Sequence, residues 1–206
     1  MLVRPSDYIF PGTPIAVILP PVEGVGEAIR DATALASERA SSDDLEFAVR
    51  QLVEVAVRAL SPGINDPNSA TSVLNRLGAM LCALASLHLP TGVHLREARL
   101  VLQVPSVAYG GLVDAMFHMI RQNAAGSTAV LIRMLEVLTA VVSCERDTGR
   151  VTALQRHADL VMSDAERSIG SPQDLNDVRE RHAGFALTRC SGPLGLLGAG
   201  GTDGGP

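Results

Sequence analysis

The sequence contains neither tryptophan nor lysine, and aromatic residues make up only 3% of it. Its 17 basic residues are therefore all arginines, and 22 acidic residues bring the formal net charge to −5. An acidic balance argues against nucleic-acid binding, which requires a basic face or stripe. The shortage of aromatic rings also argues against a surface on which bases or sugars would stack.

Cysteine is scarce as well, with three residues at Cys82, Cys144 and Cys190. An odd number of distant cysteines fits neither a disulfide framework nor a thiolate zinc site, and it favours a reducing compartment. The N-terminus lacks the pattern of a signal peptide. No apolar run reaches the roughly 18–20 residues that a membrane-spanning helix needs. The sequence thus predicts a soluble, cytoplasmic chain without a membrane span.

Apolar residues are plentiful, at 47% of the 206 residues, whereas charged residues make up 19%. This composition excludes a disordered chain, and the length suffices for one sizeable core. We therefore predict a single domain over residues 1–190. Residues 191–206 are rich in glycine and are predicted to form a disordered tail.

Two short apolar segments near the N-terminus, residues 7–10 and 15–19, flank a Pro-Gly turn. This pattern is typical of a β-hairpin. Residues 98–104 form a third apolar segment that ends before Pro105. The sequence therefore predicts a small N-terminal antiparallel sheet made of the hairpin and this later strand.

Helical spacing of apolar residues covers most of the remaining chain. The predicted helices span residues 25–39, 44–60, 67–88, 111–123, 128–146, 151–168 and 172–186. The helix over 44–60 is the clearest, because its apolar stripe is accompanied by oppositely charged residues at every fourth position. The predicted fold class is therefore α+β, predominantly α-helical, with about five to seven helices packed against the small sheet.

The segment RALSPGINDPNSA, residues 58–70, joins two of these helices. Asp66 and Pro67 are a typical helix start, and the free N–H groups of a helix start can bind an anion. Arg58, Arg50 or Arg76 would supply a counter-charge, with Ser61 and Asn65 nearby in the loop. Arg121, on a later helix, is a further candidate for anion binding. The alternative is that Asn65 and Asp66 only close and cap an interhelical turn.

Asp114, His118 and Arg121 share the polar side of the predicted helix 111–123, at positions i, i+4 and i+7. An aspartate that orients a histidine can make it a general base, although a solvent-exposed pair has the same spacing. The five histidines show no local metal-binding spacing, so no metal or cofactor is predicted. A metal site assembled from distant positions stays open.

Three segments resemble one known family. They are DLEFAVRQLVEVAVRALSPGINDPNSA (residues 44–70), the opening VRPSDYIFPGTPIAVI, and residues 120–133 with their Ile-Arg-Gln and Val-Leu-Ile-Arg stretches. Together they resemble the domain-of-unknown-function 2254 family of predicted bacterial membrane proteins, over roughly residues 3–165. Members of that family carry several transmembrane helices before this region. The resemblance therefore implies a stand-alone version or a fragment of a longer protein, and it implies no catalytic residues.

Two functions follow as hypotheses. The first is a self-associating module, without enzymatic activity, that binds or senses a small anionic ligand. The second is a cofactor-independent enzyme whose acid and base groups line an interhelical pocket. Its acid and base would be Asp114 with His118, or Asn65 with Asp66. Convergence of these residues on one pocket would favour the enzyme.

Overall fold

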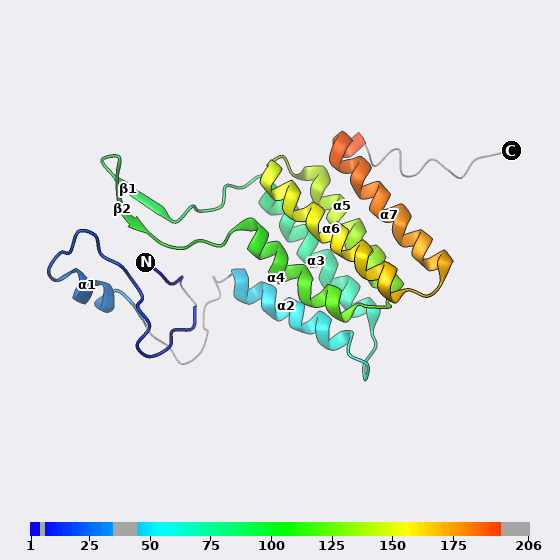
Figure 1. The fold of residues 1–206 in the computed structure, drawn as a ribbon, viewed down its shortest axis with the longest axis horizontal. Helices are drawn as coiled ribbons and strands as arrows, with labels where there is room; N and C mark the ends of the chain where they lie inside the picture. The colour runs from blue at the N-terminus through cyan, green and yellow to red at the C-terminus, as the bar shows by residue number, and fades with distance from the viewer. Residues whose placement is uncertain (5–6, 35–44, 195–206) are drawn as a thin grey trace. The chain divides into compact units, whose positions relative to one another are not determined.

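A computed structural model describes residues 1–4, 7–34 and 45–194 of the chain (Figure 1). The described residues form seven α-helices, one antiparallel hairpin and a short 3₁₀ helix. The helices are α1 (Val25–Asp31), α2 (Leu45–Ala59), α3 (Pro67–Ala85), α4 (Tyr109–Asn123), α5 (Thr128–Cys144), α6 (Thr148–Ser168) and α7 (Pro172–Ser191). The strands are β1 (Val93–Arg96) and β2 (Arg99–Gln103), and the 3₁₀ helix is η1 (Gly192–Leu194).

The chain divides into two compact units. Residues 1–47 and 89–108 form one, here called the hairpin unit, and residues 48–88 and 109–206 form the other, the bundle unit. The prediction of one domain over residues 1–190 stays a prediction. The predicted disordered tail lies outside the described residues from position 195 onward.

Helix α5 lies at the centre of the bundle unit and contacts α3, α6 and α7, while α4 packs on α6 (Figure 1). Its position agrees with its composition, because apolar residues occupy nearly every side of the helix and nine of its residues are buried. A helix that is hydrophobic all round belongs in a core. The buried side chains of the other helices complete this core, among them Leu77, Phe117, Leu154 and Phe185.

Helices α3 and α5 approach each other closely at Gly78. A Cβ atom at this position would lie 2.5 Å from Cγ1 of Val137, which is far inside van der Waals contact. Glycine is therefore required here by the neighbouring helix and not by backbone conformation.

The turn before α3 is fixed by Asp66, whose carboxylate accepts hydrogen bonds from the backbone N–H groups of Asn68 and Ser69.

The predicted fold class is wrong about the sheet. Residues 7–10 and 15–19 form no strands, and the sheet consists of two strands at residues 93–103. Prolines at positions 11, 14 and 20 explain part of this result, because proline donates no backbone hydrogen bond to a ladder. The N-terminal segment is instead held by isolated bonds, such as Leu2 N–H to the Ile15 carbonyl at 2.8 Å.

The hairpin that does form turns at Glu97 and Ala98, between the paired residues Arg96 and Arg99. Both turn residues have positive φ angles, 51° and 59°. Positive φ at both central positions is the mark of a type I′ turn, which suits the twist of a hairpin but favours Asn-Gly sequences. Glu-Ala carries no such signal, so the sequence did not predict strand β1.

Candidate functional site

Helices α4 and α6 bring four polar side chains together in the bundle unit. Asp114 of α4 uses one oxygen, Oδ1, to meet Nε2 of His157 at 2.7 Å and Nε2 of His118 at 3.2 Å. Arg156, which precedes His157 on α6, also donates to Oδ1. The two imidazole rings lie 4.8 Å apart, centre to centre. We call Asp114, His118 and His157 the Asp–His–His cluster.

Burial sets the protonation of this cluster. His157 is fully buried, and the cost of burying a charge lowers its pKa to about 4 despite the hydrogen bond to Asp114. Burial alone would raise the pKa of Asp114, but hydrogen bonds from His157 and Arg156 outweigh it, and the pKa is lowered. At neutral pH, His157 is therefore neutral beside an ionised carboxylate, and its proton lies on Nε2. Among the described residues, no hydrogen-bond partner meets the buried Nδ1 atom of either histidine.

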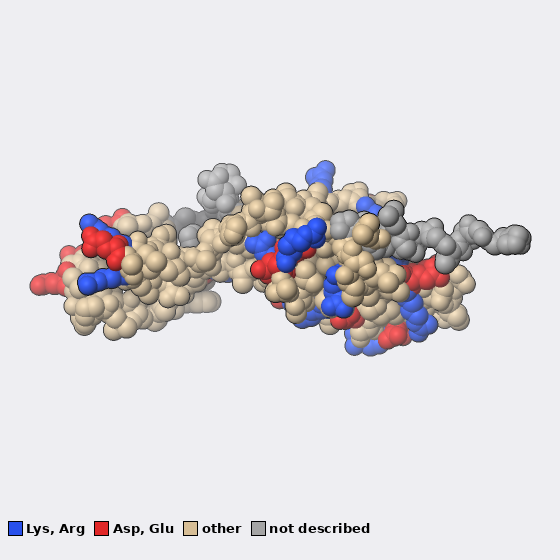
Figure 2. Space-filling view, turned by 90° about the horizontal axis from the view of Figure 1, so that it is seen from above, with Lys and Arg blue, Asp and Glu red and all other residues tan. Residues whose placement is uncertain are grey.

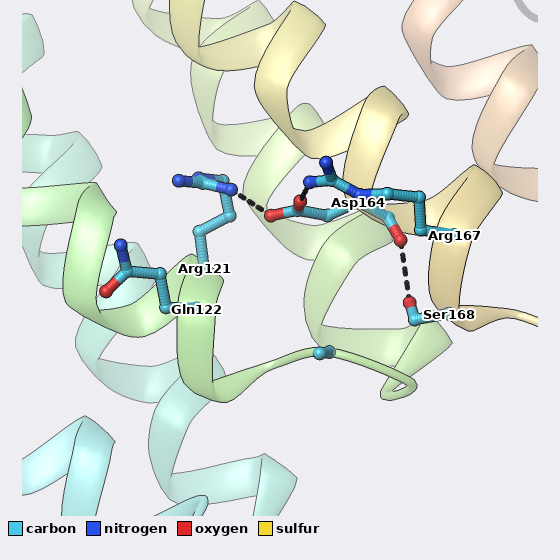
Figure 3. Close-up of a pocket in the computed structure, with 6 residues that line it drawn as sticks. Arg121, Gln122, Asp164, Arg167 and Ser168 are labelled. Carbon is cyan, nitrogen blue, oxygen red and sulfur yellow. Dashed lines mark hydrogen bonds and ion pairs between the residues drawn. The ribbon is translucent and has the colours of Figure 1, made fainter.

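Further along the same two helices lies a pocket of about 340 Å³ (Figure 3). It is lined by Arg121, Gln122, Ala125, Asp164, Arg167 and Ser168. The Asp164 carboxylate lies between the two arginines and accepts a hydrogen bond from each, as Figure 3 shows. The Ser168 hydroxyl donates to the Asp164 carbonyl at 2.8 Å and accepts the Gly126 N–H at 3.1 Å.

The charges around this pocket are unequal, since two guanidinium groups face one carboxylate. Arg121 is only 7% exposed, and its buried Nε–H meets no acceptor in the part of the chain that the structure describes. A guanidinium group has five N–H donors in a planar fork that matches carboxylate and phosphate oxygens. Elsewhere, on the face drawn in Figure 2, arginines alternate with acidic side chains and gather into no basic patch.

The loop predicted to bind anions is organised by its own hydrogen bonds. Ser61 Oγ donates to the Arg58 carbonyl at 2.7 Å, and the Asn65 N–H donates to the Ser61 carbonyl at 2.9 Å. Asn65 itself has a positive φ of 48°. The Arg58 side chain pairs with Glu54, one turn earlier on α2. In the described part of the chain, no hydrogen bond or ion pair joins this loop to Arg121.

Sequence reasoning placed Asp114, His118 and Arg121 on one polar side of a helix, and the structure keeps them there. It missed the residues of α6 that complete these groups. His157 and Arg156 contact Asp114, and Asp164 pairs with both Arg121 and Arg167. The four residues of α6 come about 40 residues later, and no local spacing links them to α4. The sequence pattern that could have revealed these residues is a polar stripe on α6. Like the polar stripe on α4, it consists of Asp, His and Arg. The cluster and the pocket are separate groups of residues, because neither Asp114 nor His118 lines the pocket.

Comparison with known proteins relates this chain to one family and to three mycobacterial proteins. Residues 1–140 match the family described as "Predicted membrane protein (DUF2254)". Uncharacterised proteins of Mycobacterium bovis and of two strains of Mycobacterium tuberculosis are each 33% identical to it over 138 residues. These 138 residues are 66% of this chain but only 26% of each relative. No solved structure matches the chain.

Although that family is described as one of membrane proteins, no helix among the described residues has the length and apolar character to cross a bilayer. The match extends from the start of the chain to the last turns of α5, and it includes the SPGINDP segment on which the resemblance was based. The chain therefore belongs to the DUF2254 family of predicted membrane proteins.

Proposed function

We propose that the bundle unit binds a small anion in the pocket between Arg121 and Arg167. The observation that carries this proposal is the state of Arg121, whose guanidinium is almost buried yet has an N–H group without an acceptor. A buried, unsatisfied donor on a charged group costs free energy that an anionic oxygen would recover. The anion would be a phosphate, a sulfate or the carboxylate of a small metabolite, because these match the guanidinium fork.

Asp164 is the natural competitor for this anion. Its carboxylate already occupies the position between the two arginines, so a bound anion has to share them with it. Replacing Asp164 with asparagine keeps the shape and removes the competing charge. We therefore expect Asp164→Asn to bind anions more tightly than the unaltered protein, which is the opposite of what loss of a structural contact would produce.

The loop at residues 58–66 is a weaker place for the same function. Asp66 puts a negative charge at the start of α3 and uses the N–H groups of Asn68 and Ser69 itself. Arg58 is 74% exposed and already paired with Glu54. We therefore centre the proposal on Arg121 and keep Arg58, Ser61, Asn65 and Asp66 as an untested prediction. Self-association, a sensory role and the enzymatic alternative likewise stay predictions.

Calorimetric titration of inorganic phosphate and sulfate into the full chain at low ionic strength tests the proposal. Arg167→Gln removes one arginine that is 70% exposed, so folding should be preserved. Arg179→Gln is the matched control, because it removes the same charge from an exposed position on α7. We expect affinity to fall at least about 10-fold in Arg167→Gln, in keeping with the roughly 1.5–3 kcal/mol value of a hydrogen bond to a charged group, and to stay unchanged in Arg179→Gln. Equal losses in the two variants, or no binding by the unaltered protein, would refute the pocket.

A further inference from the structure

We propose that the Asp–His–His cluster binds a divalent transition-metal ion, with Zn²⁺ as the natural occupant. Asp114 and His118 are one turn apart on α4, and His157 comes from α6; together they bring one carboxylate oxygen and two imidazole nitrogens close to one another. One ligand atom from each residue can be chosen so that all three lie within 4.8 Å of one another. This inference is independent of the anion pocket, which shares no residue with the cluster.

The geometry is close to that of a metal site without an ion. At zinc–nitrogen and zinc–oxygen distances of about 2.0–2.2 Å, neighbouring ligand atoms in a tetrahedral site are separated by roughly 3.4 Å. The Asp114 oxygen is 3.2 Å from Nε2 of His118 and 2.7 Å from Nε2 of His157. An ion bound to all three would therefore need both histidine nitrogens to move slightly away from the Asp114 oxygen. Two of the three residues, Asp114 and His118, are on α4 and are one helical turn apart.

The type of ligand selects the metal. Two imidazoles and one carboxylate suit Zn²⁺ and neighbouring transition metals, whereas Mg²⁺ and Ca²⁺ prefer sites made of oxygen alone. Three protein ligands leave a fourth position for water. The side chains of Asp114 and His118 are 37% and 35% exposed, so an ion and its water can reach the cluster from solvent.

The buried Nδ1 atoms restrict how an ion could be held. His157 is completely buried, and among the described residues its Nδ1 has no hydrogen-bond partner; the same is true of the Nδ1 of His118. Coordination through Nε2 would place the proton of each neutral imidazole on Nδ1, which a metal-bound histidine usually donates to a carboxylate, a carbonyl or a water molecule. An ion in this cluster would therefore need a water molecule or a side-chain movement to supply acceptors for these two N–H groups.

Arg156 opposes the ion, because its positive charge lies against the same carboxylate oxygen. This competition predicts opposite effects of two substitutions on metal affinity. Removing Arg156 should tighten metal binding, whereas removing a ligand should weaken it. A cluster that serves only to hold α4 and α6 together would show no metal affinity to change in either direction.

The test uses the tag-free full chain after treatment with a chelator. Titration with Zn²⁺, and with Co²⁺ as a spectroscopic probe, should give one equivalent of binding and a visible Co²⁺ spectrum. His118→Gln should lower affinity by at least about 100-fold, since even partners that only orient a metal ligand are worth 10–100-fold. Arg156→Gln should raise it.

His182→Gln is the matched control. His182 also contacts an aspartate, with its Nε2 2.8 Å from Oδ1 of Asp159, but it belongs to no Asp–His–His cluster. Circular dichroism establishes whether each variant folds, and if His118→Gln does not, the direction of change in Arg156→Gln decides. The proposal fails if the unaltered protein binds neither ion, if folded His118→Gln binds as tightly, if His182→Gln loses as much, or if Arg156→Gln binds no more tightly.

Discussion

The hairpin unit and the bundle unit use apolar residues in opposite ways. Every buried residue among those described lies in the bundle unit, whereas no described residue of the hairpin unit is buried. Both strands of the hairpin are exposed along their whole length, and Leu95, Leu100 and Val101 are about 60% exposed. A two-stranded hairpin without a covering layer is marginal by itself. Apolar composition therefore predicts a core only where a second layer is present to cover it.

The largest effect should come from removing a core side chain of the bundle unit. Leu77 on α3 is fully buried, so Leu77→Ala should lower the free energy of unfolding by about 2–5 kcal/mol, through lost burial and the cavity left behind. Leu95→Ala, the same change at a 62% exposed position of β1, should change it by less than about 0.5 kcal/mol. Urea unfolding measures both. Similar losses of unfolding free energy would show that leucines in the two units are equally buried. That result would contradict the difference in burial between the units.

A smaller loss is expected at Gly78, where α3 and α5 approach each other closely. Gly78→Ala places a methyl group 2.5 Å from Val137, and overpacking of this kind costs about 1–3 kcal/mol. Gly111→Ala, near the start of α4, meets no atom within 4 Å. There, alanine should be neutral or should stabilise the protein by up to about 1 kcal/mol, because it favours helices over glycine. The melting temperature should fall in Gly78→Ala and should stay the same or rise in Gly111→Ala. A rise in both variants would contradict the close approach of α3 and α5 at Gly78.

The start of α3 should contribute less, and its contribution should depend on pH. Hydrogen bonds from the hydroxyl and backbone of Ser69 lower the pKa of Asp66 below its usual 3.8, because they favour the ionised form. Its stabilising effect is therefore complete above pH 3.8 and is lost as pH falls through the lower pKa of the folded state. At pH 7 the melting temperature of Asp66→Ala should be lower than that of the unaltered protein, and this difference should narrow near pH 3. A constant difference would show that the ionised cap is not responsible.

Local signals predicted the helices of the bundle well. The breakers Ser61, Pro62 and Gly63 end α2, and the Asp-Pro pair starts α3, so these helices lie within a few residues of the predicted ranges. The sheet was misplaced because the turn at Glu97 and Ala98 lacks the residues that such turns favour. A local turn signal can also mislead, since the Pro-Gly pattern near the N-terminus forms a turn without strands.

Only the part of the candidate site that lies on α4 could be predicted from the sequence. Asp114, His118 and Arg121 share one side of α4, and helical spacing alone reveals that. Their partners on α6 depend on which face of that helix packs against α4, which is a matter of long-range packing. Asp114 and His157 are 43 positions apart in the chain, and no periodicity within one helix connects them. The polar stripes of Asp, His and Arg on α4 and α6 were therefore the one available signal for the pocket and the cluster.

The smallest global effect, and the finest test of the comparison, lies in the hairpin turn. Ala98 has a φ of 59°, a conformation that costs a residue with a Cβ atom about 1–2 kcal/mol and glycine almost nothing. Ala98→Gly should stabilise the hairpin by up to about 1 kcal/mol, or roughly fivefold in amide-exchange protection of β1 and β2. Ala98→Val should lower that protection, because a branched side chain fits this conformation poorly. In both variants the melting of the bundle unit should stay unchanged. If the bundle melted differently, the two units would unfold together, and the exposed hairpin would share in the stability of the core.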